Sequence, residues 1–397
     1  MLSVAPQSPR WTESLGHPVR SVNTLRGGLT PLARPDLPSV RRYREHLVAT
    51  AGWLAASAGR GAGSSAHYSV VSGWSAPYPE TTGYLIPTLL RLHGVMPELG
   101  CHRVADDLGT WLLGIQADGG FWRGGLHRTS HIGVPSVFNT AQVLRGLVAL
   151  SAETPDPRWL SAAQKGATWL ASAVDRNGLW PAGDYKSDVM PSYYSYAASA
   201  MLDVGLQTRD RFVQQAAERV LDAIAGRCGT NGAFAGWAFA SSGPAFTHTI
   251  AYTLQGFVES AEMLGDWPRY GALVETALQR LIRHAELRGG ALPGRLTDEW
   301  KPASRSVCLT GNAQVALCLL AWDARHPDLR LVNAAAKLID YVCDTQRLRS
   351  PLRGVRGGVG GSSPIWGRYM TLRYPNWSAK YHCDALMTLI DRLRCEA

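Results

Sequence analysis

The chain has 397 residues, of which 46% are hydrophobic and 18% charged, so it is long and apolar enough to bury a large core. Its net charge is +9, but the basic residues are scattered and no nucleic-acid-binding motif is present, which argues against a nucleic-acid partner. No apolar run approaches the roughly 20 residues of a membrane span. Seven cysteines without a CxxC pair favour reduced thiols in a cytoplasmic enzyme over a disulfide framework.

The first 40 residues differ in character from the rest of the chain. They contain several prolines together with Arg10, Arg20, Arg26 and Arg34, but no apolar stretch of signal-peptide length. We expect residues 1–40 to form a poorly ordered leader and residues 41–397 to form one folded domain.

Six short segments after residue 70 share a small residue, then a long polar or aromatic residue, then an apolar run. They recur roughly every 60 residues, which suits one helical hairpin with its loops. The six pairs are Gly83-Tyr84, Ala141-Gln142, Ser195-Tyr196, Ala251-Tyr252, Ala313-Gln314 and Ala379-Lys380.

Amphipathic stretches lie between these segments and carry charges on one face, as outer helices do. They are Arg158–Val174, Arg209–Ala225, Tyr270–Ala285 and Leu329–Cys343. The repeated segments, such as Thr140–Ala149 and Asn312–Ala321, are apolar almost all round, as expected for helices packed on both sides. The pattern predicts an all-α fold, an (α/α)6 toroid with six inner and six outer helices.

Glycine-bearing segments follow several of the predicted outer helices. They span residues 116–122, 177–180 and 231–234. Glycine tolerates the backbone conformations of tight turns, so each segment is expected to reverse the chain.

A second residue accompanies each long side chain, four positions earlier. Because residues at i and i+4 share one helix face, each inner helix is expected to point a two-residue column at one central pocket. The earlier residues are Glu80, Phe138, Ser192, His248, Thr310 and Asn376.

Glu80 and His248 are the candidates for acid/base catalysis, because a carboxylate and an imidazole that face one pocket can exchange protons with a substrate. Tyr194 is added as a phenol acid, although as a core aromatic it would be equally ordinary. For Ser192, Thr310 and Asn376 we favour helix caps or hydrogen-bonded core groups over chemistry.

The predicted substrate-binding groups combine aromatic rings that stack on sugars with amides and charged groups. They are Tyr84, Trp122, Gln142, Tyr196, Tyr252, Asn312, Gln314, Arg356, Asn376, Trp377, Lys380 and Asp384. Arg356 belongs to a late arginine cluster that suits a carboxylate or phosphate, with a solvated basic loop as the alternative.

No metal or other cofactor is expected. Cys308, His382 and Cys383 are possible zinc ligands, but no two have a standard ligand spacing. Buried free thiols are the favoured interpretation.

Two resemblances bear on fold and function. Gln116, Gly120 and Trp122 resemble the QW repeat of squalene cyclases and related prenyltransferase toroids, but the repeat occurs in full once and the Asp-x-Asp-Asp acid motif is absent. Further segments resemble bacterial toroid proteins found with polysaccharide-biosynthesis enzymes and loosely labelled prenyltransferase-like. These segments are Tyr78–Tyr84, Val137–Leu147, Phe246–Tyr252, Cys308–Gln314 and Tyr374–Asp384. The last two also resemble, more faintly, the helical domain of glucuronyl C5-epimerases, where His382 and Cys383 depart from the pattern.

Three functions remain open on the sequence. The first is a carbohydrate-active enzyme that acts on an anionic, uronate-type saccharide by epimerisation, elimination or glycoside cleavage. Cleavage would require a second carboxylate beside Glu80, from Asp184, Asp188, Glu299 or Asp384. The others are a terpene-cyclase-like enzyme with an aromatic lining for carbocations, and a non-catalytic glycan-binding toroid. The oligomeric state is not indicated.

Overall fold

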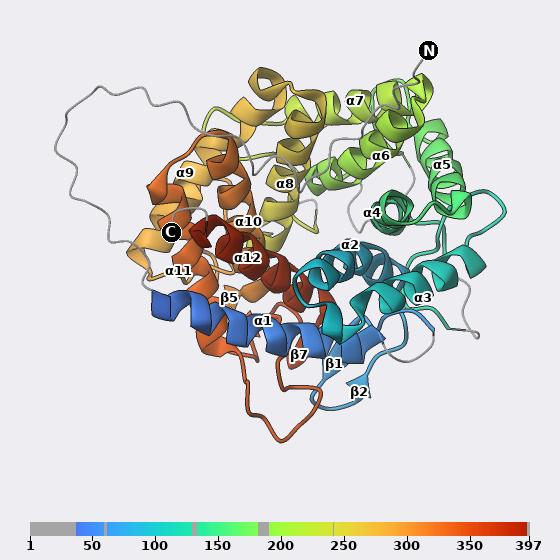
Figure 1. Cartoon of the computed structure of the whole chain (residues 1–397). Coiled ribbons are helices and arrows are strands. Elements are labelled where there is room, and N and C mark those ends of the chain that lie inside the picture. The colour runs from blue at the N-terminus through green and yellow to red at the C-terminus, as the bar shows by residue number, and fades with distance from the viewer. Residues whose placement is uncertain (1–36, 59–61, 129–132, 182–189, 241, 395–397) are drawn as a thin grey trace, which may run out of the picture.

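The computed structural model describes residues 37–58, 62–128, 133–181, 190–240 and 242–394. Most of the predicted leader, residues 1–36, lies outside the described residues, and the first helix, α1, begins at Leu37. The described chain forms twelve α-helices in two concentric layers (Figure 1). None of these helices combines the length and apolar character needed to cross a membrane.

The inner layer is a closed ring of six helices. Each inner helix packs on the next, and the last packs on the first. Glycine makes some of these contacts close, because a Cβ at Gly83 would collide with the backbone of Val143 on the neighbouring helix. The inner helices are α2 (Pro79–Val95), α4 (Val137–Glu153), α6 (Ser195–Thr208), α8 (Thr247–Leu264), α10 (Leu309–Arg325) and α12 (Asn376–Arg394).

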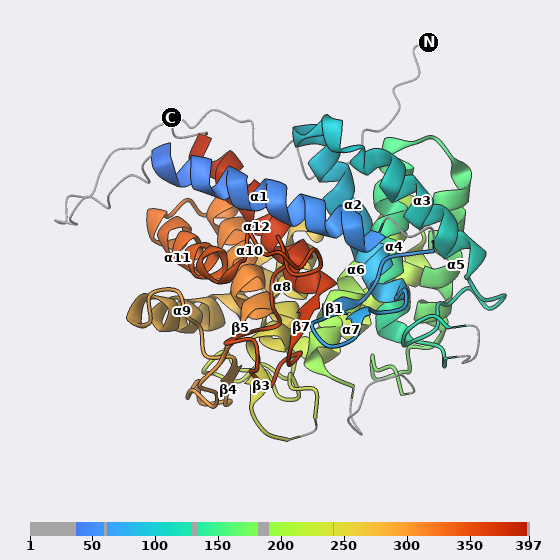
Figure 2. The ribbon, with the colours of Figure 1, turned by 90° about the horizontal axis from the view of Figure 1, so that it is seen from below.

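The outer layer has one helix for each inner one. The first described helix, α1, packs on the last, α12, so the two ends of the fold form the sixth pair (Figure 2). This arrangement confirms the predicted (α/α)6 toroid. The outer helices are α1 (Leu37–Ala58), α3 (Cys101–Gly114), α5 (Pro157–Ser172), α7 (Arg211–Ala225), α9 (Ala272–Leu287) and α11 (Leu329–Thr345).

The two layers differ in how their helices bury side chains. In α7, Val213, Val220 and Ile224 are buried at helical spacing, whereas Asp210 caps the helix by accepting from the backbone N–H groups of Phe212 and Val213. Inner helices such as α10 bury nearly every residue of their first three turns, because they pack on an outer helix and on both ring neighbours.

A glycine with positive φ follows each outer helix and lies against the next outer helix. At Gly290, with φ 85°, a Cβ would collide with the carbonyl oxygen of Lys337 on α11, and at Gly357, with φ 79°, with that of Ala49 on α1. The remaining members are Gly63, Gly120, Gly178 and Gly232. Three of these six turns were predicted, and the contact at Gly357 closes the outer ring.

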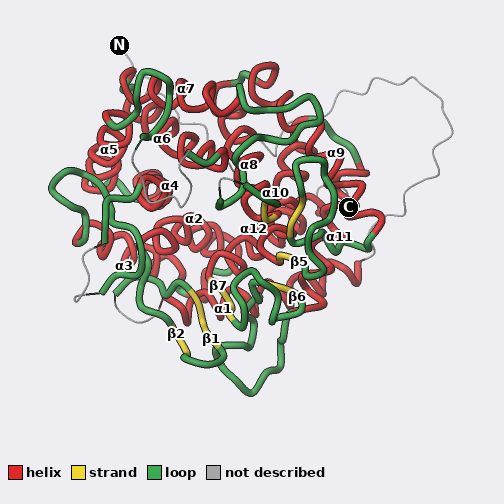
Figure 3. The backbone as a smooth tube through the Cα atoms, turned by 180° about the vertical axis from the view of Figure 1, so that it is seen from behind, coloured by secondary structure: helices red, strands yellow, loops and turns green. Residues whose placement is uncertain are grey.

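Short strands fix the loops at the N-terminal ends of the inner helices, a face that we call the mouth (Figure 3). β1 (His67–Ser69) pairs antiparallel with both β2 (Gly73–Trp74) and β7 (Arg373–Pro375). β3 (Ala245–Phe246) pairs with β4 (Arg295–Leu296), and β5 (Val307–Cys308) with β6 (Ser362–Ser363). Because β3, β5 and β7 directly precede α8, α10 and α12, they hold the starts of those helices in place.

Substituting Gly290 tests the inter-helix contact. Gly265 is the matched control, since its φ is also positive, 66°, but no atom would lie near an added Cβ. Both alanine variants should lose unfolding free energy because alanine disfavours a left-handed backbone. We expect Gly290→Ala to lose a further ~1–3 kcal/mol of unfolding free energy through overpacking. Urea unfolding of the two variants measures the difference, and equal losses would contradict the close contact.

Candidate functional site

The repeat brings the predicted columns to the mouth. Glu80, Phe138, His248 and Thr310 are each the second residue of an inner helix, on α2, α4, α8 and α10. Ser192 precedes α6, and Asn376 begins α12. The common position means that the six helices present equivalent turns to the same end of the ring.

His248 is buried at the mouth and held in a defined orientation. It is 4% exposed, and its Nδ1 lies 2.5 Å from Oε1 of Gln314 on α10, a residue predicted to bind substrate. Burial lowers the pKa of His248 to about 4, although the Gln314 contact acts in the opposite direction. The imidazole is therefore neutral at pH 7, and an Nδ1–H that donates to Gln314 leaves Nε2 with a lone pair.

Glu80 faces the same central residues from the opposite side of the ring. Its Oε2 accepts a 2.5 Å hydrogen bond from the hydroxyl of Tyr78. Burial raises the pKa of Tyr252, and the negative charge of Glu80 raises it further. The His248 ring lies 4.3 Å from the ring of Tyr252. Helices α2 and α8 lie on opposite sides of the inner ring. Even so, the charge of Glu80 affects the pKa of Tyr252, and the ring of His248 packs against the ring of Tyr252.

Aromatic rings pack on one another around this pair. The ring of Phe138 lies 5.3 Å from Tyr252 and 5.7 Å from Tyr194, and Tyr196 stacks on Tyr252 at 4.9 Å. Tyr369 lies 5.4 Å from His248. Tyr369 could not be predicted from the repeat, because it comes from the loop before α12 and belongs to no repeated column.

Trp377 supports this cluster, since its Nε1 donates to the Tyr369 hydroxyl at 2.8 Å. The structure thus gives Trp377 a partner within the mouth.

The second row of the columns supplies buried polar atoms that have no protein partner. These atoms include the Tyr84 hydroxyl, both side-chain amide atoms of Gln142, and Nε2 of Gln314. They come from α2, α4 and α10 at the same helical register. A hollow at the surface is lined by Arg288, Pro302 and Arg305, and none of the residues of the columns contributes to its lining.

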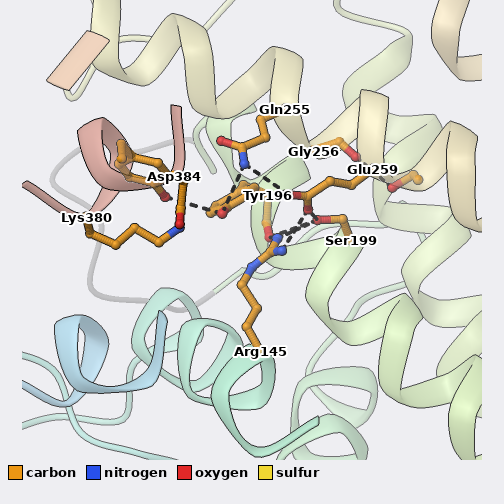
Figure 4. A network of polar contacts seen from close by, with 10 residues as sticks. Arg145, Tyr196, Ser199, Gln255, Gly256, Glu259, Lys380 and Asp384 are labelled. Carbon is orange, nitrogen blue, oxygen red and sulfur yellow. Dashed lines mark hydrogen bonds and ion pairs between the residues drawn. The ribbon is translucent and has the colours of Figure 1, made fainter. Parts of the chain in front are cut away.

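A charged network lies deeper, around Tyr196 (Figure 4). The guanidinium of Arg145 lies 3.7 Å from the centre of the Tyr196 ring and 2.7 Å from Oε2 of Glu259. Although burial alone would lower the pKa of Arg145, Glu259 raises it overall. The hydroxyls of Tyr381 and Tyr196 lie 3.3 Å apart and connect this pair to the opposite wall.

Lys380 and Asp384 form a second ion pair beside the same tyrosines. The Lys380 Nζ lies 3.0 Å from Asp384 Oδ2 and 4.1 Å from the ring centre of Tyr381. Burial opposes the charge on Lys380, but Asp384 raises its pKa overall. Both predicted substrate-binding residues are therefore paired with each other.

Four predicted substrate-binding residues have structural contacts instead. Trp122 is fully buried, and its indole N–H donates to the Leu112 carbonyl of outer helix α3. Asn312 donates to the Gly290 carbonyl, because it lies two residues before Gln314, about 200° around α10 and hence on the outer face. Asn376 donates to Ser57 and Ser64, and Arg356 is exposed and donates to the Ser350 carbonyl.

Ser192 and Thr310 are buried core groups with hydrogen-bond partners, one of the two roles favoured from the sequence. Ser192 donates to the carbonyl of Ala235, and the Thr310 hydroxyl pairs with that of Ser378. Both residues connect neighbouring segments of the ring.

The two candidate second carboxylates among the described residues, Glu299 and Asp384, are poorly placed for glycoside cleavage. Glu299 is exposed, and Asp384 is held by Lys380 and Thr88. Asp184 and Asp188 lie outside the described residues.

Arg295 is a cation at the mouth that lies outside the repeated columns predicted from the sequence. Its guanidinium lies 5.0 Å from the ring centre of Phe246 and donates to the Pro244 carbonyl. Phe246 lies 5.1 Å from Tyr369, which connects Arg295 to the aromatic cluster. In the sequence, Arg295 is a single arginine outside the late arginine cluster, so no pattern indicated that it would lie at the mouth.

Cys308 does not join His382 and Cys383 in a ligand cluster within the described chain. Burial raises the pKa of the Cys308 thiol to about 12, as expected for an inert core cysteine.

In sequence, the chain matches no family model and no curated protein. In fold, it is similar to cellobiose 2-epimerase from Spirochaeta thermophila, with a TM-score of 0.69 and 15% identity over 90% of this chain and 99% of that one. Unsaturated glucuronyl hydrolase from Bacillus sp. GL1 gives a TM-score of 0.65 and 16% identity over 87% and 96%. An unsaturated glucuronyl hydrolase specific for heparin gives 0.68 and 13% over 88% and 97%. At these identities the likeness shows the fold.

The buried state of His248 predicts an acid-dependent loss of stability. The unfolded chain binds a proton at this residue below its ordinary pKa of 6.5, whereas the folded chain does so only below about 4. The stability that His248 contributes is present above pH 6.5 and is lost as the pH falls toward 4. We expect His248→Asn to reduce the slope of unfolding free energy against pH by about 1.4 kcal/mol per unit in this window. Urea unfolding at several pH values tests this, with exposed His127→Asn as control.

The Arg145–Glu259 pair predicts strong coupling. Their side chains are 16% and 13% exposed. Removing one partner, as in Glu259→Gln, is expected to cost about 3–5 kcal/mol, and adding Arg145→Met should restore much of it. The more exposed pair of Arg330 and Glu286 provides the control, where Glu286→Gln should cost about 0–1 kcal/mol. Additive losses at Arg145 and Glu259 would refute the coupling.

Proposed function

We propose that this chain is a carbohydrate-active enzyme that acts on a uronate-bearing saccharide by acid/base chemistry at the mouth. The observation that carries the proposal is the neutral imidazole of His248, which Gln314 holds against Tyr252. The charge of Glu80 raises the pKa of the same tyrosine. Because it is buried, fixed and neutral at pH 7, His248 offers the lone pair of Nε2 as a proton acceptor.

The reaction that suits these groups is proton transfer at the carbon next to the uronate carboxylate. His248 Nε2 takes the C5 proton, and the electron pair passes into the carboxylate. In epimerisation, a proton returns to the other face of C5. In elimination, the C4 substituent leaves with a proton. The Tyr78 hydroxyl is the candidate for proton donation, and Glu80 holds it in place by accepting its hydrogen bond at 2.5 Å.

Three features of the mouth support a saccharide as the ligand. The unpartnered atoms of Tyr84, Gln142 and Gln314 match the donors and acceptors of sugar hydroxyls. The aromatic rings offer stacking surfaces. Arg295 can bind the carboxylate, because guanidinium groups recognise carboxylates with two parallel hydrogen bonds.

The alternatives fit the same residues less well. An isoprenoid would leave the polar atoms of Gln142 unpartnered, at a cost of about 1–3 kcal/mol each. Glycoside cleavage requires a second carboxylate, whereas Asp384 is already paired. The similar folds described as cellobiose 2-epimerase and unsaturated glucuronyl hydrolase support action on a saccharide. With the resemblance to toroids found with polysaccharide-biosynthesis enzymes, we place this activity in cytoplasmic polysaccharide metabolism.

Incubating the protein with uronate oligosaccharides in heavy water tests the proposal. Deuterium should appear at C5, or a double bond should form, as measured by mass spectrometry and NMR. His248→Asn and Glu80→Gln are each expected to lower the rate about 10²- to 10⁴-fold. His284→Asn is the matched control, because His284 lies on outer helix α9 and contacts the Trp300 carbonyl. Activity should fall as the pH drops through about 4, where His248 gains its proton.

Other outcomes would point elsewhere. Saccharide binding without exchange or product in the wild type would indicate a glycan-binding toroid. Turnover of a polyprenyl diphosphate would indicate a terpene-cyclase-like enzyme. Full activity of His248→Asn would contradict the assigned base.

A further inference from the structure

Three side chains that commonly bind metals meet at the seam where the ring closes. They are His46 on α1, Cys343 on α11 and His382 on α12, and all three are buried. One ligand atom from each lies within 4.8 Å of the other two, and Cys343 Sγ lies 3.7 Å from His382 Nε2. Figure 2 shows α1 lying along α12, with α11 beside them.

The spacing suits a tetrahedral zinc ion. Zinc–sulfur bonds of ~2.3 Å and zinc–nitrogen bonds of ~2.0–2.1 Å place tetrahedral ligand atoms about 3.3–3.6 Å apart. The distance between Cys343 and His382 is already close to this range. The third atom, within 4.8 Å, requires an inward shift of about 1 Å.

The surroundings of His46 fix which nitrogen is available. Thr50 Oγ1 donates to the His46 carbonyl, so it accepts from Gln346 Nε2, which also donates to the Gly357 carbonyl. Gln346 Oε1 therefore faces His46 Nδ1 as an acceptor, at 2.6 Å, and Nδ1 carries the proton. His46 Nε2 keeps its lone pair, the arrangement of a metal-binding histidine with an outer hydrogen-bond partner.

His382 faces this seam because of its position on the helix, as Asn312 faces the outer layer because of its own. It follows Lys380 by two residues, about 200° around α12, so Lys380 points into the ring and His382 away from it. Its Nδ1 is buried without a protein partner. The candidate site is thus separate from the mouth.

We propose that His46 Nε2, the Cys343 thiolate and His382 Nε2 bind one Zn²⁺, with a water completing the tetrahedron. On binding, the Sγ–H bond of Cys343 breaks, its proton passes to solvent, and a zinc–sulfur bond forms. The ion fastens α1 to α11 and α12, next to the ion pairs of Arg42 with Asp340 and Asp344. This role is structural and independent of the proposed catalysis.

Titration of the metal-free, full-length protein tests the site. Zn²⁺ should bind with one ion per chain by elemental analysis and raise the melting temperature. Co²⁺ should give the visible bands of a tetrahedral ion and a thiolate charge-transfer band. Cys343→Ala should abolish the charge-transfer band. Gln346→Ala, which removes the partner of His46, should weaken Zn²⁺ affinity about 10- to 100-fold.

Cys318→Ala is the matched control, since Cys318 is an equally buried thiol on α10. It should leave zinc affinity and the cobalt spectrum unchanged. The proposal fails if the folded wild type takes up no Zn²⁺, if the charge-transfer band survives Cys343→Ala, or if Cys318→Ala removes it. Should Cys343→Ala not fold, the wild-type titration and Gln346→Ala decide the question.

Discussion

The close approach of neighbouring inner helices is the constraint on which the site depends. Gly83 lies against the backbone of α4, Gly256 against that of α6, and Gly311 against that of α8 beside His248. A larger residue at these positions would push the helices apart. Because the ring is narrow, Glu80 and His248 reach the same tyrosine from opposite walls. Glycines on the inner helices are thus as important for the site as the long side chains of the repeated pairs.

Polarity inside the ring changes in kind from the mouth inward. At the mouth, Glu80 and His248 are titratable groups held by neutral partners. In the next row, Gln142 has polar atoms without partners. Deeper still, the charge of Arg145 is neutralised by Glu259. Burying polar atoms costs free energy unless they are paired. The paired ions therefore stabilise the fold, whereas the row of unpartnered atoms is where a ligand would form the most favourable new hydrogen bonds.

The fold was predictable from the sequence because a period of about 60 residues and two kinds of helix face leave few alternatives. The columns at the mouth followed from the same period. Loop residues were not predictable in this way. Arg295 reaches the mouth on the paired strand β4, and Tyr369 on the loop between β6 and β7, and no helical pattern encodes either position. The errors at Trp122 and Asn312 arose from helix rotation and turn geometry, which direct these side chains to the outer layer.

The two buried histidines His248 and His382 show that the helix face on which an imidazole lies decides its role. Burial lowers the pKa of His248 to about 4 and that of His382 to about 3, so both rings are neutral at pH 7. His248 shares its surroundings with an amide and tyrosines, where a neutral imidazole can accept a proton from carbon. His382 shares its surroundings with a thiol and a second imidazole, where the same lone pair can bind a cation. A rotation of about 200° on an inner helix therefore separates the chemistry of the ring interior from that of the seam.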